Sequence, residues 1–224
     1  MLCPVDGVAL LDHALARVAP LVSEVAVNAR YGVEQIVEHV AGRAHVSDER
    51  SFPEELGTAG AIGALREWLD GRAALVVNGD TWTDVDVAPL VDGWDGERVR
   101  VLVHDGDLVP GARIVASLVP AADVARLPAT PLGLSNGLWW PALADGRLES
   151  ISGAGRFVSC DRPRDYLLAN LLASGGRSVV GVGAVVEGTI ERCVVWPGAR
   201  VRADEVLVDA IRCDDGTTVL VRQR

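Results

Sequence analysis

A six-residue spacing of aliphatic residues near the carboxyl end is the feature that most narrows the possible folds of this sequence. Val180 and Val186 are one period apart, and after a shift the spacing resumes at Val195, Val201 and Leu207. Such spacing, with glycines at the turns, is typical of a parallel β-helix. We therefore expect residues 177–224 to form a short left-handed β-helix of hexapeptide repeats. A β-helix this short has only two or three coils, so it needs the rest of the chain or another subunit to cover its ends.

The residues ahead of this repeat alternate between helix and strand patterns. Apolar residues recur at helical spacing over residues 8–18 and 33–40, and a short strand pattern at residues 24–28 lies between them. A further helix is expected at residues 165–172, begun by Pro163 and ended by two glycines. Alternation of this kind is typical of an α/β fold with a mostly parallel sheet. We expect one such domain over residues 1–174.

An apolar run at residues 75–77 ends in Asn78, Gly79 and Asp80. Ligands of open α/β sheets bind outside the carboxyl ends of the strands, so this strand would carry an acidic oxygen to the crevice. Mg²⁺ prefers oxygen ligands, usually one or two carboxylates together with substrate phosphates. Asp80 is therefore the best single candidate for a metal ligand.

Small residues stand where the next helix upstream should begin, at Gly57, Thr58, Ala59 and Gly60. A helix N-terminus offers unpaired N–H donors and a partial positive charge, so this turn can hold a phosphate or the edge of a nucleobase. A tight helix start packed against the sheet would explain the same residues. The sequence leaves both interpretations open.

The composition excludes several classes of partner. A net charge of −10 argues against nucleic acid, whose binding proteins usually present a basic face. No apolar run approaches the roughly 20 residues of a membrane span, and the first residues lack the basic start of a signal peptide. All 21 basic residues are arginine, so the chain contains no lysine. The cysteines show no paired spacing, which predicts reduced thiols and a cytoplasmic location; they are Cys3, Cys160, Cys193 and Cys213.

Taken in order, several segments resemble the sugar-1-phosphate nucleotidylyltransferases, or NDP-sugar pyrophosphorylases, and are similar to mannose-1-phosphate guanylyltransferase-like proteins. These enzymes join a Rossmann-like nucleotidyltransferase domain to a hexapeptide β-helix, and the resemblance covers nearly the whole chain. Each segment is modest alone, but their order and spacing are specific. The segments are residues 2–14, 25–28 with 31 and 34–36, 56–61, 78–80 and 163–170.

The resemblance implies an activity and a set of site residues. In that family a sugar phosphate oxygen attacks the α-phosphorus of a nucleoside triphosphate, which yields an NDP-sugar and releases pyrophosphate. The resemblance implies that Asp80 binds Mg²⁺ and that Asn136 stands near the sugar. It also implies a nucleotide-binding set made of Gly57, Thr58, Ala59, Gly60 and Asn78.

The sequence departs from the family at groups that carry the chemistry. Family members place a strand and a Gly-rich phosphate-binding loop ahead of the residues that align with Met1. Ser159 stands where the second metal carboxylate is expected, and Asp161 is the candidate to replace it, displaced by roughly 7 Å along an extended chain. The lysine-bearing element of the family has no counterpart in a chain without lysine.

Two main hypotheses remain. The chain is an active nucleotidylyltransferase with Mg²⁺ held by Asp80 and Asp161, or a catalytically silent nucleotide-binding or regulatory homologue. In either case we expect it to form a homo-oligomer, or to pair with another subunit, through the β-helix. Loss of one preorganised charge commonly costs on the order of 10²-fold in rate, which favours the silent homologue. An acyltransferase built on the β-helix is a third, weaker hypothesis, because all four histidines precede the repeats.

Overall fold

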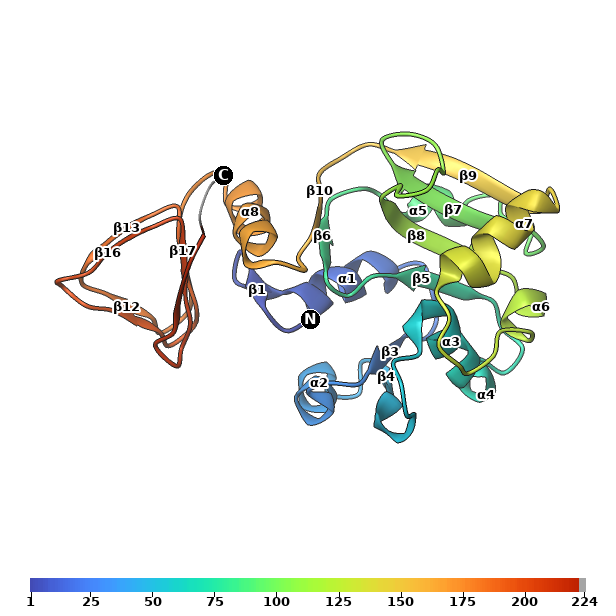
Figure 1. Cartoon of the computed structure of the whole chain (residues 1–224), viewed down its shortest axis with the longest axis horizontal. Helices are drawn as coiled ribbons and strands as arrows, with labels where there is room; N and C mark the ends of the chain where they lie inside the picture. Colours follow the sequence, from blue (N-terminus) through green and yellow to red (C-terminus); the bar gives the residue numbers. More distant parts are fainter. Residues whose placement is uncertain (222–224) are drawn as a thin grey trace. The chain divides into compact units, whose positions relative to one another are not determined.

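The computed structural model describes residues 1–221 and divides into two compact units (Figure 1). Unit 1 comprises Met1–Ala14, Gly79–Asp84 and the chain from Arg156 onward. Unit 2 comprises Leu15–Asn78 and Val85–Gly155. The chain therefore passes between the units several times. Among the described residues, no helix combines the length and the apolar character needed to cross a membrane.

Unit 2 is built on a four-stranded sheet in the order β5-β8-β7-β9. Its strands are β5 (Ala74–Val77), β8 (Ile114–Val119), β7 (Val99–His104) and β9 (Leu148–Gly153). Only the β7–β9 pair is parallel, whereas β8 is antiparallel to both of its neighbours. The expectation of a mostly parallel sheet was wrong here, because the short link between β7 and β8 makes a hairpin and leaves no room for a crossover helix.

A second sheet of unit 2 has two parallel strands, β3 (Ala26–Ala29) and β4 (His45–Asp48). The helix between them, α2 (Val33–Val40), connects them as a βαβ unit and buries its apolar stripe, residues Val33, Ile36 and Val40. The helix spacing read from the sequence at residues 33–40 is confirmed, and the strand expected at residues 24–28 is observed slightly later.

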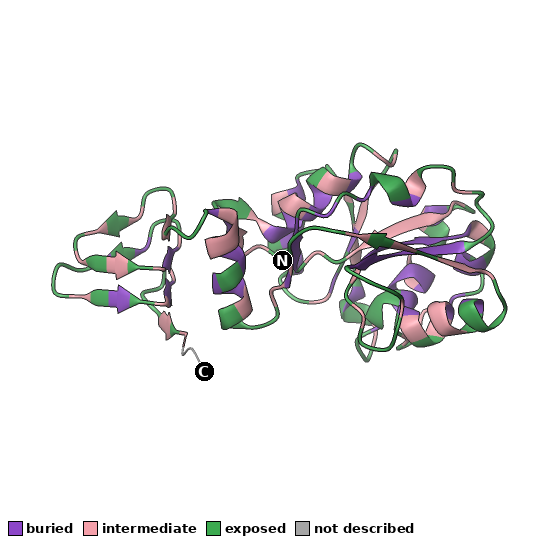
Figure 2. Cartoon of the chain, turned by 90° about the horizontal axis from the view of Figure 1, so that it is seen from above, coloured by how far each residue is buried: buried purple, intermediate pink, exposed green. Residues whose placement is uncertain are grey.

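Short helices surround these strands, and Figure 2 shows buried residues concentrated in the sheet of unit 2. All six residues of β7 are buried. The helical segments of unit 2 are η1 (Glu49–Ser51), α3 (Gly57–Ala64), α4 (Arg66–Leu69), α5 (Ala88–Val91), α6 (Ala121–Val124), η2 (Ser135–Trp139) and α7 (Trp140–Ala144).

Unit 1 joins distant parts of the sequence around one helix, α8 (Pro163–Ala173). The Tyr166 hydroxyl of α8 donates to the Pro4 carbonyl at 2.5 Å and accepts from the indole N–H of Trp196 at 3.0 Å. One buried side chain therefore ties the first residues to the C-terminal repeat. The other elements here are the hairpin β1 (Pro4–Val5) and β2 (Val8–Ala9), the antiparallel pair β6 (Thr81–Thr83) and β10 (Phe157–Ser159), and α1 (Leu10–Val18), which continues into unit 2.

The last part of the described chain winds into a three-sided parallel coil, which we call the C-terminal coil (Figure 1). Strands one turn apart pair in parallel, with Val179 opposite Val194 and Val194 opposite Ile211. The expected interior positions Val195, Val201 and Leu207 are buried, whereas Val180, in the first turn, is half exposed. The strands are β11 (Val179–Val180), β12 (Val185–Val186), β13 (Thr189–Glu191), β14 (Val194–Val195), β15 (Arg200–Val201), β16 (Val206–Val208), β17 (Ala210–Arg212) and the antiparallel β18 (Thr218–Leu220).

Candidate functional site

Three glycines of α3 lie on one face of the helix, where a loop of the same unit contacts them. A Cβ atom on Gly60 would stand 2.3 Å from the Thr130 carbonyl oxygen, and one on Gly63 would stand 2.4 Å from that of Pro128. Gly57 has a φ of +63°, a conformation that other residues rarely adopt. The glycines therefore let the backbone of residues 128–133 approach the helix closely.

The same loop uses donors at the start of α3. The Leu132 carbonyl accepts from the N–H groups of Ala59 at 3.0 Å and Gly60 at 3.2 Å. Both of these residues are buried, while Gly57 and Thr58 are exposed. The packing interpretation of the small residues thus accounts for half of the turn. Gly57 and Thr58 stay exposed to solvent, although Gly57 also lies against the Leu132 carbonyl.

The segment that leads into this turn is held by Arg30, which follows β3. Its guanidinium donates to the carbonyl oxygens of Glu49 at 3.0 Å, Phe52 at 2.9 Å and Glu54 at 3.1 Å. A guanidinium can satisfy several carbonyls at once because its donors form a rigid fork. Burial raises the pKa of the Glu49 carboxyl. The role of Arg30 could not be predicted from the sequence, since a loop held through main-chain carbonyls leaves no side-chain pattern.

Asn136 lies on the short π-helical segment η2 and is exposed. The next residue, Gly137, packs so closely on the turn that a Cβ atom there would stand 3.3 Å from the Cβ of Ala59. Segments of this kind are often found at functional sites. Unit 2 therefore brings the proposed sugar-contacting residue next to the α3 turn.

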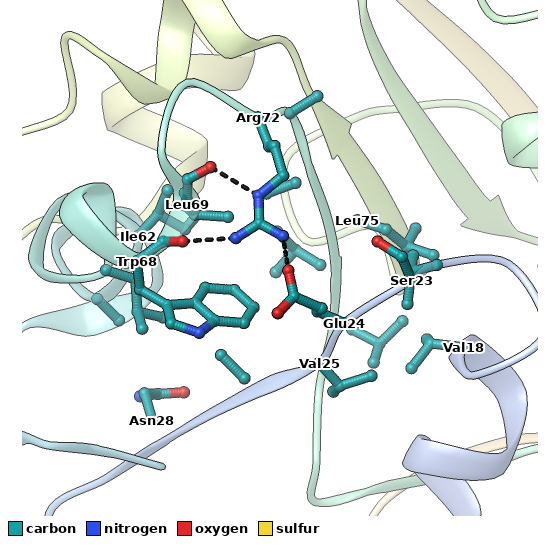
Figure 3. Close-up of a pocket in the computed structure, with 18 of the residues that line it drawn as sticks. Val18, Ser23, Glu24, Val25, Asn28, Ile62, Trp68, Leu69, Arg72 and Leu75 are labelled. Carbon is teal, nitrogen blue, oxygen red and sulfur yellow. Dashed lines mark hydrogen bonds and ion pairs between the residues drawn. The ribbon is translucent and has the colours of Figure 1, made fainter. Parts of the chain in front are cut away.

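A cavity of about 400 Å³ lies on the opposite face of α3 (Figure 3). Thr58, Ile62 and Leu65 line it from the helix, and residues of β3 and β5 line it from the two sheets. Its lining is mainly aliphatic. The charged groups there are Glu24 and Arg72, which form an ion pair, and the Arg72 guanidinium lies 5.0 Å from the ring centre of Trp68. Asn78, the residue after β5, is exposed.

The two metal-ligand candidates both lie near Cys160 in unit 1. The N–H of Cys160 donates to the Asp80 carbonyl at 2.9 Å, and the Ser159 hydroxyl donates to the Asp161 carboxylate at 2.8 Å. Burial, and then the negative charges of Asp80 and Asp161, raise the pKa of the Cys160 thiol to about 11. Both carboxylates therefore lie within electrostatic reach of one thiol. The antiparallel pairing that sets Ser159 opposite Thr81 explains why.

Asp80 and Asp161 are both exposed, so a cation and its water ligands could reach their carboxylates from solvent. Within residues 1–221, no group of three His, Cys, Asp or Glu side chains is arranged to hold a metal. Two carboxylates suit Mg²⁺, which usually takes its other ligands from water and phosphate.

Three solved structures share most of this architecture. A mannose-1-phosphate geranyltransferase from Thermus thermophilus superposes with a TM-score of 0.66 over 96% of this chain and 86% of its own, at 16% identity. The chain has the fold of the sugar-1-phosphate nucleotidyltransferases. HddC from Yersinia pseudotuberculosis, complexed with GMP-PN, matches with a TM-score of 0.58 at 14% identity, covering 77% of this chain and 88% of its own. A UDP-glucose pyrophosphorylase from Acinetobacter baumanii gives 0.57 at 11% identity, covering 76% and 84%.

At these identities the comparisons establish the fold of a sugar-1-phosphate nucleotidyltransferase and leave the activity to be tested. No protein-family model matches the sequence. The nucleotide- and sugar-binding candidates of this fold, from Gly57 to Asn78 and Asn136, belong to unit 2. The metal candidates Asp80 and Asp161 belong to unit 1. Each group is assembled within its own unit, and its binding role stays a prediction.

The close packing on the glycine face of α3 predicts whether one substitution raises or lowers the stability of the protein. Gly60→Ala would stabilise an unconstrained helix by up to about 1 kcal/mol. Here the added methyl group meets the Thr130 carbonyl, so we expect a loss of about 1–3 kcal/mol of unfolding free energy. Urea denaturation measures this change. Gly133→Ala is the matched control, because the nearest atom to its Cβ is 3.9 Å away. Stabilisation by Gly60→Ala would contradict the close contact with the loop.

The surroundings of Cys160 predict low thiol reactivity. With a pKa near 11 in place of 9, its thiolate fraction at pH 8 is about a hundredfold lower than that of a free thiol. The native state holds this proton more tightly than the unfolded state, so the raised pKa contributes to the free energy of unfolding. This contribution is fully present below pH 9 and declines as pH rises toward 11. Alkylation of Cys160 followed by mass spectrometry measures the reactivity.

The Asp80→Asn and Asp161→Asn substitutions should each speed that alkylation, because each removes a negative charge that disfavours the thiolate. Asp107→Asn, an exposed position in unit 2, serves as the control. An unchanged rate in both unit 1 variants would show that the two carboxylates do not act on Cys160.

Proposed function

We propose that this chain binds a nucleoside triphosphate or an NDP-sugar with Mg²⁺ and, as this chain alone, transfers no nucleotidyl group. The observation that carries the proposal is the pair of carboxylates, Asp80 and Asp161, that the β6–β10 pairing sets around Cys160. The fold shared with nucleotide-handling proteins supports the choice of ligand, and one of those proteins is complexed with GMP-PN.

Each candidate residue has a role in this proposal. Asp80 and Asp161 would hold Mg²⁺ through carboxylate oxygens, and the metal would neutralise charge on the phosphates. Gly57 and Thr58, the open half of the α3 turn, would contact the base together with Asn78, while the buried Ala59 and Gly60 shape the turn. Asn136 would donate to sugar hydroxyls with its side-chain amide.

The missing cations are the reason to expect binding without turnover. Nucleotidyl transfer depends on positive charge placed around the phosphates as the attacking and leaving oxygens exchange. The chain has no lysine, and two first-turn N–H donors of α3 already bond to Leu132. Each missing charge commonly costs on the order of 10²-fold in rate, so the losses together leave little catalysis.

An active sugar-1-phosphate nucleotidylyltransferase is the second candidate. It is favoured by the presence of two carboxylates near Cys160, since two are enough for a catalytic Mg²⁺ that also binds phosphate. In this candidate Asp161 replaces the carboxylate absent at Ser159, to which it is hydrogen-bonded.

The proposal includes the organisation of the chain. We assign residues 1–174 to the nucleotidyltransferase-like domain and residues 177–224 to a left-handed β-helix of hexapeptide repeats, of which residues 222–224 lie outside the described part of the chain. The C-terminal coil exposes Val182, Val206 and Val208, with Val182 at 89% exposure. Exposed aliphatic side chains on a short coil favour contact with a second copy or with an active subunit.

The four free cysteines are consistent with a cytoplasmic location.

Two measurements on the same protein distinguish nucleotide binding from nucleotidyl transfer. Isothermal calorimetry with GTP, dTTP, UTP and UDP-glucose, each with and without Mg²⁺, should show Mg²⁺-dependent binding of at least one triphosphate. Release of pyrophosphate, assayed with glucose 1-phosphate and mannose 1-phosphate, should stay at background. Asp80→Asn should weaken Mg²⁺-dependent binding by about tenfold, a loss of roughly 1.4 kcal/mol.

The matched control for that variant is Asp107→Asn, an exposed aspartate of unit 2. It should leave the affinity unchanged. Failure of every nucleotide to bind would reject the proposal. Metal-dependent release of pyrophosphate would reject the silent homologue and select the active enzyme.

A further inference from the structure

Arg17, in the last turn of α1, turns the polar end of its side chain away from solvent. The residue as a whole is partly exposed, yet its Nε, Nη1 and Nη2 atoms are all buried. A long basic side chain at a protein surface usually does the reverse, burying its aliphatic stem and keeping its charged head in water. The guanidinium of Arg17 is therefore directed into the protein.

No group in the described part of the chain satisfies this guanidinium. None of its three nitrogens has a hydrogen-bond partner within residues 1–221. Burial lowers the pKa of the guanidinium, and no carboxylate of these residues raises it again. Arginine keeps its proton in proteins, so the side chain cannot escape burial of its charge by becoming neutral. Arg17 therefore carries a buried positive charge that the described residues leave uncompensated.

Arg100 shows how the same unit satisfies another guanidinium that it buries. It donates to the Glu149 carboxylate at 2.9 Å. It also donates to the carbonyl oxygens of Leu90 at 3.0 Å and Asp92 at 2.7 Å. A buried arginine of this unit thus has both an anion and main-chain acceptors, whereas Arg17 has neither among residues 1–221.

The position of Arg17 on α1 separates it from the cavity of unit 2. At 100° per residue, Arg17 lies at the edge of the apolar stripe of α1, about 20° from Leu10. Val18, the next residue, lines the cavity in Figure 3, whereas Arg17 is not part of that lining. The buried members of the stripe are Leu10, Leu11, Ala14, Leu15 and Val18.

The chemistry of the guanidinium selects the kind of partner. A charge taken out of water costs a large free energy unless a counter-charge lies close to it. The guanidinium fork matches two oxygens of a phosphate or a carboxylate and binds them through two parallel hydrogen bonds. Because its nitrogens are buried, a small ion can reach them through a local movement of side chains, and a macromolecular surface cannot.

We propose that Arg17 is the binding residue for a small oxyanion, phosphate or carboxylate, held by two parallel hydrogen bonds from its guanidinium. The ion would supply the missing counter-charge and so stabilise unit 2, to which Arg17 belongs. The candidate residues for nucleotide, sugar and Mg²⁺ do not include Arg17. The site is therefore independent of the proposed function.

The thermal unfolding midpoint of the full chain, without Mg²⁺ or nucleotide, measures this binding. Sodium phosphate and sodium acetate are the two probes, and sodium chloride at the same ionic strength is the reference. We expect an oxyanion to raise the midpoint saturably, by roughly 2–4 °C above the reference. The probe with the larger effect identifies the ion as phosphate or carboxylate.

Arg17→Met removes the charge and keeps a long side chain. In chloride alone it should unfold roughly 2–4 °C above the unchanged chain, because an apolar group replaces an uncompensated buried charge. It should also lose the response to the oxyanion. Arg98→Met is the matched control, because it removes the same charge from a side chain of unit 2 that is 61% exposed. It should keep the response.

Arg17→Lys separates charge from shape. It keeps a positive charge but loses the planar fork, so the affinity for the oxyanion should fall by about tenfold. Calorimetric titration of the oxyanion into each variant measures the affinity directly.

Three results would overturn the inference. The first is no rise of the midpoint beyond the chloride reference with either oxyanion. The second is an equal rise in Arg17→Met, which would place the bound ion elsewhere. The third is a lower midpoint for Arg17→Met than for the unchanged chain in chloride, which would show that the guanidinium is already compensated. Nucleotide binding is measured separately, so failure of either proposal leaves the other standing.

Discussion

The need to pair backbone N–H and C=O groups governs unit 2 of this protein. Its strands form two sheets in place of one, and the break leaves an unpaired edge on β3 and on β5 within the described residues, with a cavity of about 400 Å³ lined by both. A buried strand edge without a partner is costly, because each unpaired polar group loses its hydrogen bonds to water. The cavity that these strands line also includes Thr58, so it borders the first turn of α3.

The helix α3 links this cavity to the candidate nucleotide site. One face, with Gly60 and Gly63, receives the backbone of residues 128–133, and the other face, with Thr58 and Ile62, borders the cavity. The first turn, between the two faces, keeps only part of its hydrogen-bonding capacity for a ligand. In unit 1, a different structural feature, the antiparallel pairing of β6 with β10, positions Asp80 and Asp161. The candidate residues for base recognition and those for metal binding are thus positioned by independent local constraints.

Local patterns in the sequence predicted the parts of the structure that depend on local periodicity. The helices at residues 10–18, 33–40 and 163–173 and the buried positions Val195 and Val201 follow directly from spacing. The antiparallel direction of β8 does not follow from the spacing of apolar residues, because that spacing is the same in parallel and antiparallel strands. The contacts of Arg30 with main-chain carbonyls could not be predicted from spacing either. The same holds for the hydrogen bonds that the N–H groups of Ala59 and Gly60 donate to the Leu132 carbonyl. The sequence indicated that Asp161 shares a face with Ser159 in an extended segment, but the hydrogen bond between the two side chains is known only from the structure.

Amide hydrogen exchange of the free protein tests the central claim, that β3 has an open edge, most directly. The pairing with β4 predicts slow exchange at Val27 and Ala29, whose N–H groups bond to β4, and exchange faster by on the order of tenfold or more at Ala26 and Asn28, whose N–H groups do not. Alternating protection along these four residues would support the account. Equal, strong protection of all four amides would show that the second edge is already paired and would contradict it.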